Sequence, residues 1–145
     1  MSFGVDRFAL EYWALSAVLL FAKMFVNSGV QGWARIRNKA FVHPEDAAFF
    51  GGVQPREREL PLVETAADAW RNDLENIPIF LFLSLGAVLL GGTSFWVGGY
   101  CAVFVLARAL HTAFYFAHRQ PHRNLAYQLG LFATIAAAIH VVSLL

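Results

Sequence analysis

The stretch from Trp70 to Pro78 most constrains how this chain can fold, because it places charged and amide side chains directly before a long apolar run. It holds two acids, one arginine and two asparagines, and the apolar run extends from Ile79 to Leu90. At about 1.5 Å per helical residue, that run is too short to cross the roughly 30 Å hydrocarbon core of a bilayer. A membrane-spanning helix here must therefore carry the polar residues into the membrane.

The composition of the chain is typical of a membrane protein. Of the 145 residues, 58% are apolar and only 14% are charged, against about 25% charged in soluble domains. Four apolar segments predict an all-α integral membrane protein, a four-transmembrane-helix bundle that forms a single domain over residues 1–145. The expected helices cover about 9–38, 61–90, 95–117 and 122–144, with a polar loop at about 39–60.

The first helix is expected to be retained rather than cleaved as a signal peptide, because no basic segment precedes it and no small-residue cleavage site follows. In the loop, Pro44 before Glu45 and Asp46 predicts a short helix, since proline and acids favour a first helical turn. Basic residues gather in this loop and in the turn near Arg119, whereas the connection between the second and third segments carries no charge. The positive-inside rule then places both termini on the non-cytoplasmic side.

Several site classes are not expected. The single cysteine, Cys101, excludes an internal disulfide and a cysteine-based metal cage. His43, His118 and His122 lack a metal-ligand spacing, so no metal site is predicted. No basic stripe with interleaved aromatic residues is present, so no nucleic acid partner is predicted.

Two polar stripes lie at matched depth on the second and third segments. Glu75 lies roughly 22 Å below Leu90, and His111 roughly 24 Å below Phe95, both in the cytoplasmic half of the membrane. Helical spacing puts each set on one face. The second segment contributes Glu64, Asp68, Arg71 and Glu75, bordered by Asn72; the third contributes Arg108, His111 and Tyr115.

Two interpretations of these stripes remain open. In one, they form a structural ion-pair network, with Arg71 bonded within its own helix and Arg108 paired with an acid of the second segment. In the other, they bind an anionic, hydrogen-bonding ligand that enters from the cytoplasm, because arginine forks bind carboxylates. Asp73 lies off the main stripe and is expected to hold a neighbouring helix rather than the ligand.

The order of motifs resembles the MAPEG family, the membrane-associated proteins in eicosanoid and glutathione metabolism. The similarity covers nearly the whole chain and rests on Arg35 to Phe41 with Pro44-Glu45-Asp46, on Arg71 to Glu75, on Arg108 with His111-Thr112 and Tyr115, and on Pro121, Arg123 and Tyr127. The resemblance implies a homotrimer that binds glutathione between protomers, reached from the cytoplasm. The implied glutathione-binding residues are Arg35, Arg71, Asn72, Glu75, His111, Tyr115, Arg123 and Tyr127, and Arg108 joins them by its place on the stripe.

The resemblance also implies catalytic roles. Arg123 matches the arginine thought to stabilise the glutathione thiolate, and Asp46 matches an acid proposed to assist prostaglandin synthesis. Prostaglandin-synthesising members have a serine, a proposed thiol activator, where this chain has Asn124. Asparagine can still donate a hydrogen bond, so Asn124 remains a catalytic candidate, but prostaglandin specificity is not carried over.

Three functions follow as hypotheses. The first is a membrane-bound glutathione transferase or peroxidase that acts on a lipophilic electrophile entering from the bilayer, with a nearby cation favouring the thiolate. The second is a glutathione-dependent isomerase of a prostaglandin-type endoperoxide. The third is a non-enzymatic lipid-binding protein, against which the retained Arg71, Asn72, Glu75 and Arg123 argue.

Overall fold

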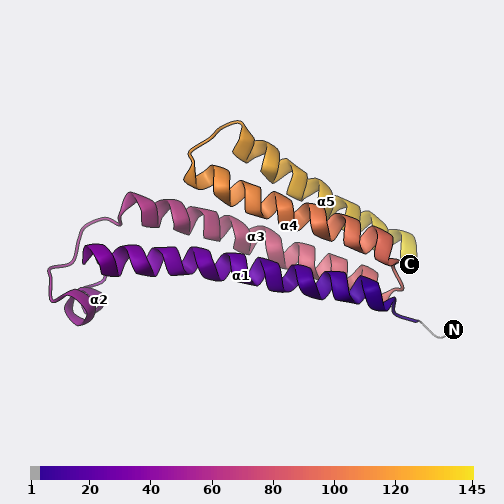
Figure 1. The fold of residues 1–145 in the computed structure, drawn as a ribbon, viewed down its shortest axis with the longest axis horizontal. Helices are drawn as coiled ribbons and strands as arrows, with labels where there is room; N and C mark the ends of the chain where they lie inside the picture. The colour runs from indigo at the N-terminus through magenta and orange to yellow at the C-terminus, as the bar shows by residue number, and fades with distance from the viewer. Residues whose placement is uncertain (1–3) are drawn as a thin grey trace.

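Four long helices form the fold, which a computed structural model describes for residues 4–145 (Figure 1). They are α1 (Arg7–Asn38), α3 (Pro61–Leu89), α4 (Ser94–Phe116) and α5 (His122–Leu144). All four are long and apolar enough to cross a membrane. The predicted all-α, four-span architecture is confirmed, and the expected and observed helix ends differ by about two residues at most, within the usual uncertainty of such ends.

The loop between α1 and α3 is partly helical. The short helix α2 (Pro44–Asp46) begins at Pro44, as its proline and acids predict, and continues into a π-helical turn, Ala47–Gly51. Figure 1 shows α2 beside the end of α1, on the side away from α4 and α5. Asp46 is therefore presented by the loop rather than by the bundle.

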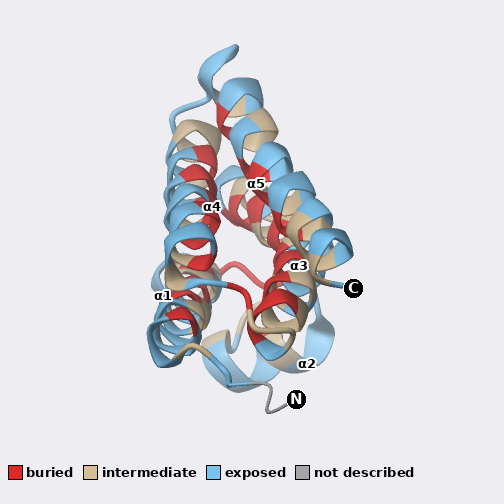
Figure 2. Cartoon of the chain, turned by 90° about the vertical axis from the view of Figure 1, so that its right-hand side faces the viewer, coloured by how far each residue is buried: buried red, intermediate tan, exposed pale blue. Residues whose placement is uncertain are grey.

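The bundle is closed by contacts between neighbouring helices. Helix α1 packs on α3 and α4, and α5 packs on the same two helices. Figure 2 shows that the buried positions face the inside of the bundle while the outer faces are largely exposed. At the centre, the rings of Phe80 (α3) and Phe104 (α4) stack with centroids 3.8 Å apart. Large apolar side chains such as Phe21, Phe25 and Phe82 are exposed on the outside, as expected of a surface that meets lipid.

Asp6 joins the beginnings of α1 and α4. Its Oδ1 accepts a hydrogen bond from the backbone N–H of Phe8 at 2.9 Å and caps α1. Its Oδ2 accepts from the backbone N–H of Ser94 at 2.7 Å. The Ser94 hydrogen bond is the main cause that lowers the pKa of Asp6 below its ordinary value. The beginning of α1 and the C-terminus both lie at this end of the bundle (Figure 1), as an even number of spans requires.

Candidate functional site

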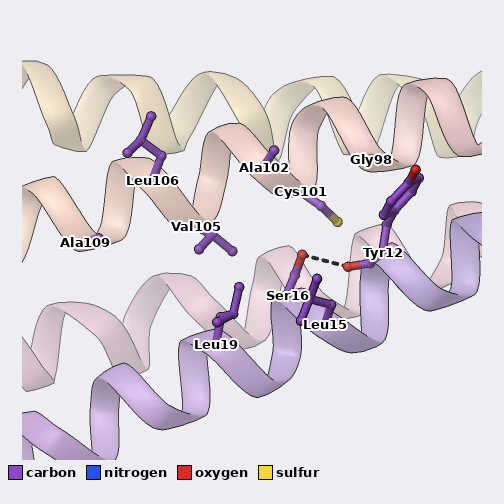
Figure 3. A pocket seen from close by; sticks show the side chains of 10 residues that line it. All are labelled: Tyr12, Leu15, Ser16, Leu19, Gly98, Cys101, Ala102, Val105, Leu106 and Ala109. Carbon is purple, nitrogen blue, oxygen red and sulfur yellow. Dashed lines mark hydrogen bonds between the residues drawn. The ribbon is translucent and has the colours of Figure 1, made fainter.

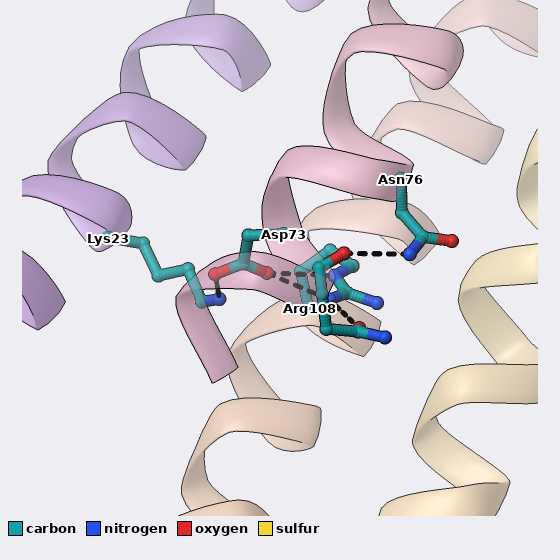
Figure 4. Close-up of polar contacts among 5 residues, drawn as sticks. Lys23, Asp73, Asn76 and Arg108 are labelled. Carbon is teal, nitrogen blue, oxygen red and sulfur yellow. Dashed lines mark hydrogen bonds and ion pairs between the residues drawn. The ribbon is translucent and has the colours of Figure 1, made fainter. Parts of the chain in front are cut away.

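A buried trio of charged residues joins three helices at the polar stretch of α3. Asp73 is fully buried and accepts from Arg108 of α4 through one oxygen, Oδ1, at 2.8 Å from Nη2 and 3.2 Å from Nε. Its other oxygen, Oδ2, is paired with Lys23 Nζ of α1. Figure 4 shows the three side chains converging from their helices. The prediction that Asp73 holds a neighbouring helix is confirmed, and the pairing of Arg108 with an acid of the second segment, part of the ion-pair interpretation, is present.

Arg108 also reaches Asn72, the residue before Asp73. Its Nη2 donates to Asn72 Oδ1, while the backbone carbonyl of Asn72 accepts from Asn76 Nδ2 at 2.7 Å. Arg108 is only 1% exposed, whereas Asn72 is partly exposed. Arg108 therefore lies behind Asn72, and Asn72 is the member of this group nearer the surface.

A second polar cluster lies between α4 and α5 and consists of His111, Tyr115, Arg123 and Tyr127; it is called the α4–α5 cluster below. The His111 ring lies 5.6 Å from the Tyr115 ring and 6.2 Å from the Tyr127 ring, centroid to centroid. Arg123 Cζ lies 4.5 Å from the Tyr115 ring centroid, a cation–π distance. His111 is buried, and its Nδ1 has no hydrogen-bond partner within residues 4–145. The fold thus brings four of the predicted glutathione-binding residues together.

The charged stripe of α3 faces outward. Glu64, Asp68, Arg71 and Glu75 are all exposed, although they belong to a helix that can span a membrane. Arg71 Nη1 lies 3.5 Å from Asp68 Oδ1, so Arg71 is paired within its own helix, as in the ion-pair interpretation. Charged side chains at membrane depth are costly when they face lipid. In the single chain this stripe is uncovered.

The remaining candidates lie in separate places. Arg35, at the end of α1, donates to Glu59 Oε1 at 2.7 Å from Nη2 and 3.0 Å from Nε, which ties the loop to α1. Asn124 is exposed in the first turn of α5. Asp46 belongs to α2, on the side of the bundle away from α5 (Figure 1), so this chain by itself does not bring it to Arg123.

An apolar cavity of about 390 Å³ lies between α1 and α4 (Figure 3). Leu15, Leu19 and Val105 contribute to its wall, and the only hydrogen bond drawn there is internal, from Ser16 Oγ to the Tyr12 carbonyl at 2.8 Å. Such a surface suits hydrocarbon rather than an anion. This cavity is therefore not a candidate for binding a charged ligand, unlike the surroundings of Asn72 and the α4–α5 cluster.

The fold and these polar groups define a multi-pass integral membrane protein with a polar site inside its helix bundle. The chain belongs to the MAPEG family, whose model matches residues 13–143. The resemblance seen in the sequence motifs is thereby confirmed.

Two kinds of relative in this family are similar to the chain over most of its length. A prostaglandin E synthase from Bos taurus is 39% identical over 134 residues, which cover 92% of this chain and 87% of the relative. The prostaglandin E synthase from Homo sapiens is 36% identical over 135 residues, covering 92% and 88%. A microsomal glutathione S-transferase 1 from Rattus norvegicus is 33% identical over 142 residues, covering 95% and 92%. Prostaglandin E synthases are thus among the relatives of this chain.

Proposed function

We propose that this protein is a membrane-bound, glutathione-dependent enzyme that activates the glutathione thiolate against lipophilic electrophiles, as a transferase or peroxidase. The observation that carries the proposal is the α4–α5 cluster, in which Arg123 is held over Tyr115 beside His111 and Tyr127. Membership of the MAPEG family and the similarity to a microsomal glutathione S-transferase support it.

The donor set fits glutathione chemically. Glutathione offers two carboxylates, two peptide groups, an amine and a thiol, and the predicted site offers arginine, asparagine, tyrosine and imidazole donors with the acid Glu75 as an acceptor for the amine. The arginines Arg35 and Arg71 suit carboxylates because a guanidinium donates two parallel hydrogen bonds. Thus the proposed binding residues are those expected from the sequence, with Arg108 acting from behind Asn72.

Arg123 is the proposed stabiliser of the thiolate. A guanidinium stays protonated at all ordinary pH, so Arg123 cannot take the thiol proton and acts instead through its charge and N–H donors. A cation near a thiol favours the thiolate, which is the nucleophilic form. Stacking on Tyr115 limits where this cation can lie, and Asn124 is a candidate second donor to the sulfur.

The proposed assembly is a homotrimer with the site facing the cytoplasm and both termini on the opposite side. The exposed charges of α3 support an assembly, because a neighbouring subunit would cover a stripe that otherwise meets lipid. The basic residues of the loop before α3 support the orientation. The lipophilic substrate would enter from the bilayer, so that the site joins a water-soluble and a lipid-soluble reactant.

Conjugation of glutathione to a generic aryl halide by the purified protein tests the proposed activity. The Arg123→Ala variant is expected to lose about a hundredfold in kcat/KM, the usual effect of removing a group that stabilises developing or fixed negative charge. Arg119→Ala is the matched control, because Arg119 is an exposed arginine in the turn before α5. Full activity of Arg123→Ala would overturn the thiolate role.

A second candidate is a glutathione-dependent isomerase of a prostaglandin-type endoperoxide. The similarity to prostaglandin E synthases at 36–39% identity favours it. In this version Asp46 assists the reaction, which requires that α2 of one protomer approach the site of another. Turnover of an endoperoxide by the wild type, with loss in Asp46→Asn, would support this version. Intact transferase activity without endoperoxide turnover would reject it.

A further inference from the structure

We propose that the buried trio Lys23, Asp73 and Arg108 is a positioning device that fixes the side-chain amide of Asn72 as a hydrogen-bond donor toward a carboxylate oxygen of the ligand. The proposal rests on the proposed function, because it names the group that the glutathione site would recognise at Asn72. Lys23, Asp73 and Arg108 act through Asn72 and need not touch the ligand.

The hydrogen bond from Arg108 orients the side-chain amide of Asn72. A guanidinium donates hydrogen bonds and accepts none, so only the oxygen of an amide can face it. Arg108 Nη2 donates to Asn72 Oδ1. The two N–H groups of Asn72 therefore point away from Arg108, and Asn72, unlike Arg108, is partly exposed. Asn72 is thereby presented as a donor and not as an acceptor.

Arg108 is in turn oriented by Asp73 and Lys23. Its Nε and Nη2 both donate to a single carboxylate oxygen, Asp73 Oδ1. Arginine more often takes a carboxylate by both oxygens in a parallel fork. Here the second oxygen, Oδ2, is occupied by Lys23 Nζ from α1. Lys23 thus keeps Arg108 on one oxygen, which leaves Nη2 in place to reach Asn72.

Burial of the three charged side chains favours a single arrangement of the trio. The side chains of Asp73, Arg108 and Lys23 are 0%, 1% and 16% exposed. An arrangement that left one of these charges buried without a partner would be higher in free energy, which favours this one arrangement. Helices α1, α3 and α4 meet at this point, so the partly exposed amide of Asn72 is held by the packed interior of the bundle rather than by a loop.

The Lys23→Met variant tests the device from its most distant member. Without Lys23, Asp73 Oδ2 is free to take Arg108 in a fork, which draws Nη2 from Asn72 and releases the amide. Equilibrium dialysis with radiolabelled glutathione measures the Kd of glutathione. Competition by glutathione diethyl ester measures the Kd of the ester, in which neither carboxylate charge is present. We expect Lys23→Met to weaken glutathione about tenfold and the ester little, because a hydrogen bond to a charged group is worth more than one to a neutral group.

The discrimination between glutathione and its ester separates positioning from general damage. Lys23→Gln is the matched control, because its amide N–H can still occupy Asp73 Oδ2, and it should retain the wild-type ratio of the two Kd values. Phe80→Leu perturbs the ring stack with Phe104 and should leave that ratio unchanged while lowering stability. If Lys23→Met does not fold, Arg108→Lys supplies the same test, since lysine keeps the charge but has no planar fork to span Asp73 and Asn72.

The binding measurements distinguish failure of the proposed function from failure of the positioning role. Absence of saturable glutathione binding by the wild type would overturn the proposed function and this inference with it. Wild-type binding combined with an unchanged ratio in the folded Lys23→Met or Arg108→Lys variant would overturn the positioning role alone. The expected result is that Lys23→Met lowers the ratio of the ester Kd to the glutathione Kd about tenfold, and that Lys23→Gln keeps this ratio at the wild-type value.

Discussion

Removing Asp73 should destabilise the protein more than any single change at its exposed acids. Asp73→Ala leaves the positive charges of Lys23 and Arg108 close together without their shared carboxylate, and these side chains are only 16% and 1% exposed. Breaking a buried ion pair by removing one partner typically costs about 3–5 kcal/mol. For a chain of this size each kcal/mol shifts Tm by about 2–4 °C, so the expected loss is roughly 6–20 °C.

Thermal unfolding in detergent, followed by circular dichroism at one fixed scan rate, measures this loss. The matched control is Glu11→Ala, an acid of α1 outside the charged stripe of α3, whose side chain is 50% exposed and lies 2.8 Å from Arg7. An exposed pair of this kind contributes about 0–1 kcal/mol. Equal, small shifts for Asp73→Ala and Glu11→Ala would show that the trio does not hold α1, α3 and α4 together.

Three further results are expected from single changes. Arg123→Lys should keep part of the conjugation activity, with kcat/KM about tenfold below wild type, because lysine retains the charge but not the planar group; activity equal to that of Arg123→Ala would contradict this. Because the folded-state pKa of Asp6 is lowered, its contribution to stability is present above the ordinary pKa of about 4 and is lost as pH falls through the folded-state pKa. Asp6→Ala should therefore lower Tm at pH 7, and this difference should shrink at pH 3; a difference that stays constant with pH would show that the bond to Ser94 is not the cause. Gly92→Ala should lower Tm, because its Cβ would lie 2.8 Å from a backbone carbonyl oxygen, at a cost of about 1–3 kcal/mol, whereas a Cβ at Gly99 meets no atom within 4 Å and Gly99→Ala should be neutral.

The sequence was sufficient to predict the membrane class, the four spans and the inter-helix role of Asp73. Helical periodicity separated Asp73 from the charged stripe of α3, and depth matching brought Arg108 to the same layer, but which acid Arg108 binds was not predicted. The short helix at Pro44 followed from local rules alone, because a proline before two acids favours a first helical turn wherever the chain lies.

Contacts that depend on how whole helices rotate against each other were not predictable in the same way. Lys23 is the only charged residue in the middle of α1, so no stripe on its own helix indicated which neighbour it would face. Glu59, the partner of Arg35, lies in a loop without periodicity. The family resemblance gave both Asp46 and Arg123 catalytic roles, but Asp46 lies in α2, away from α5, and periodicity within single helices could not predict this separation.

Isothermal titration of glutathione into the purified protein in detergent measures whether this protein binds glutathione at all. The wild type should bind saturably, Arg71→Ala should bind clearly more weakly, and Arg119→Ala should bind as the wild type does. The absence of any saturable heat with wild-type protein that is folded and monodisperse would contradict the proposed function, and would favour a lipid-binding membrane protein without glutathione chemistry.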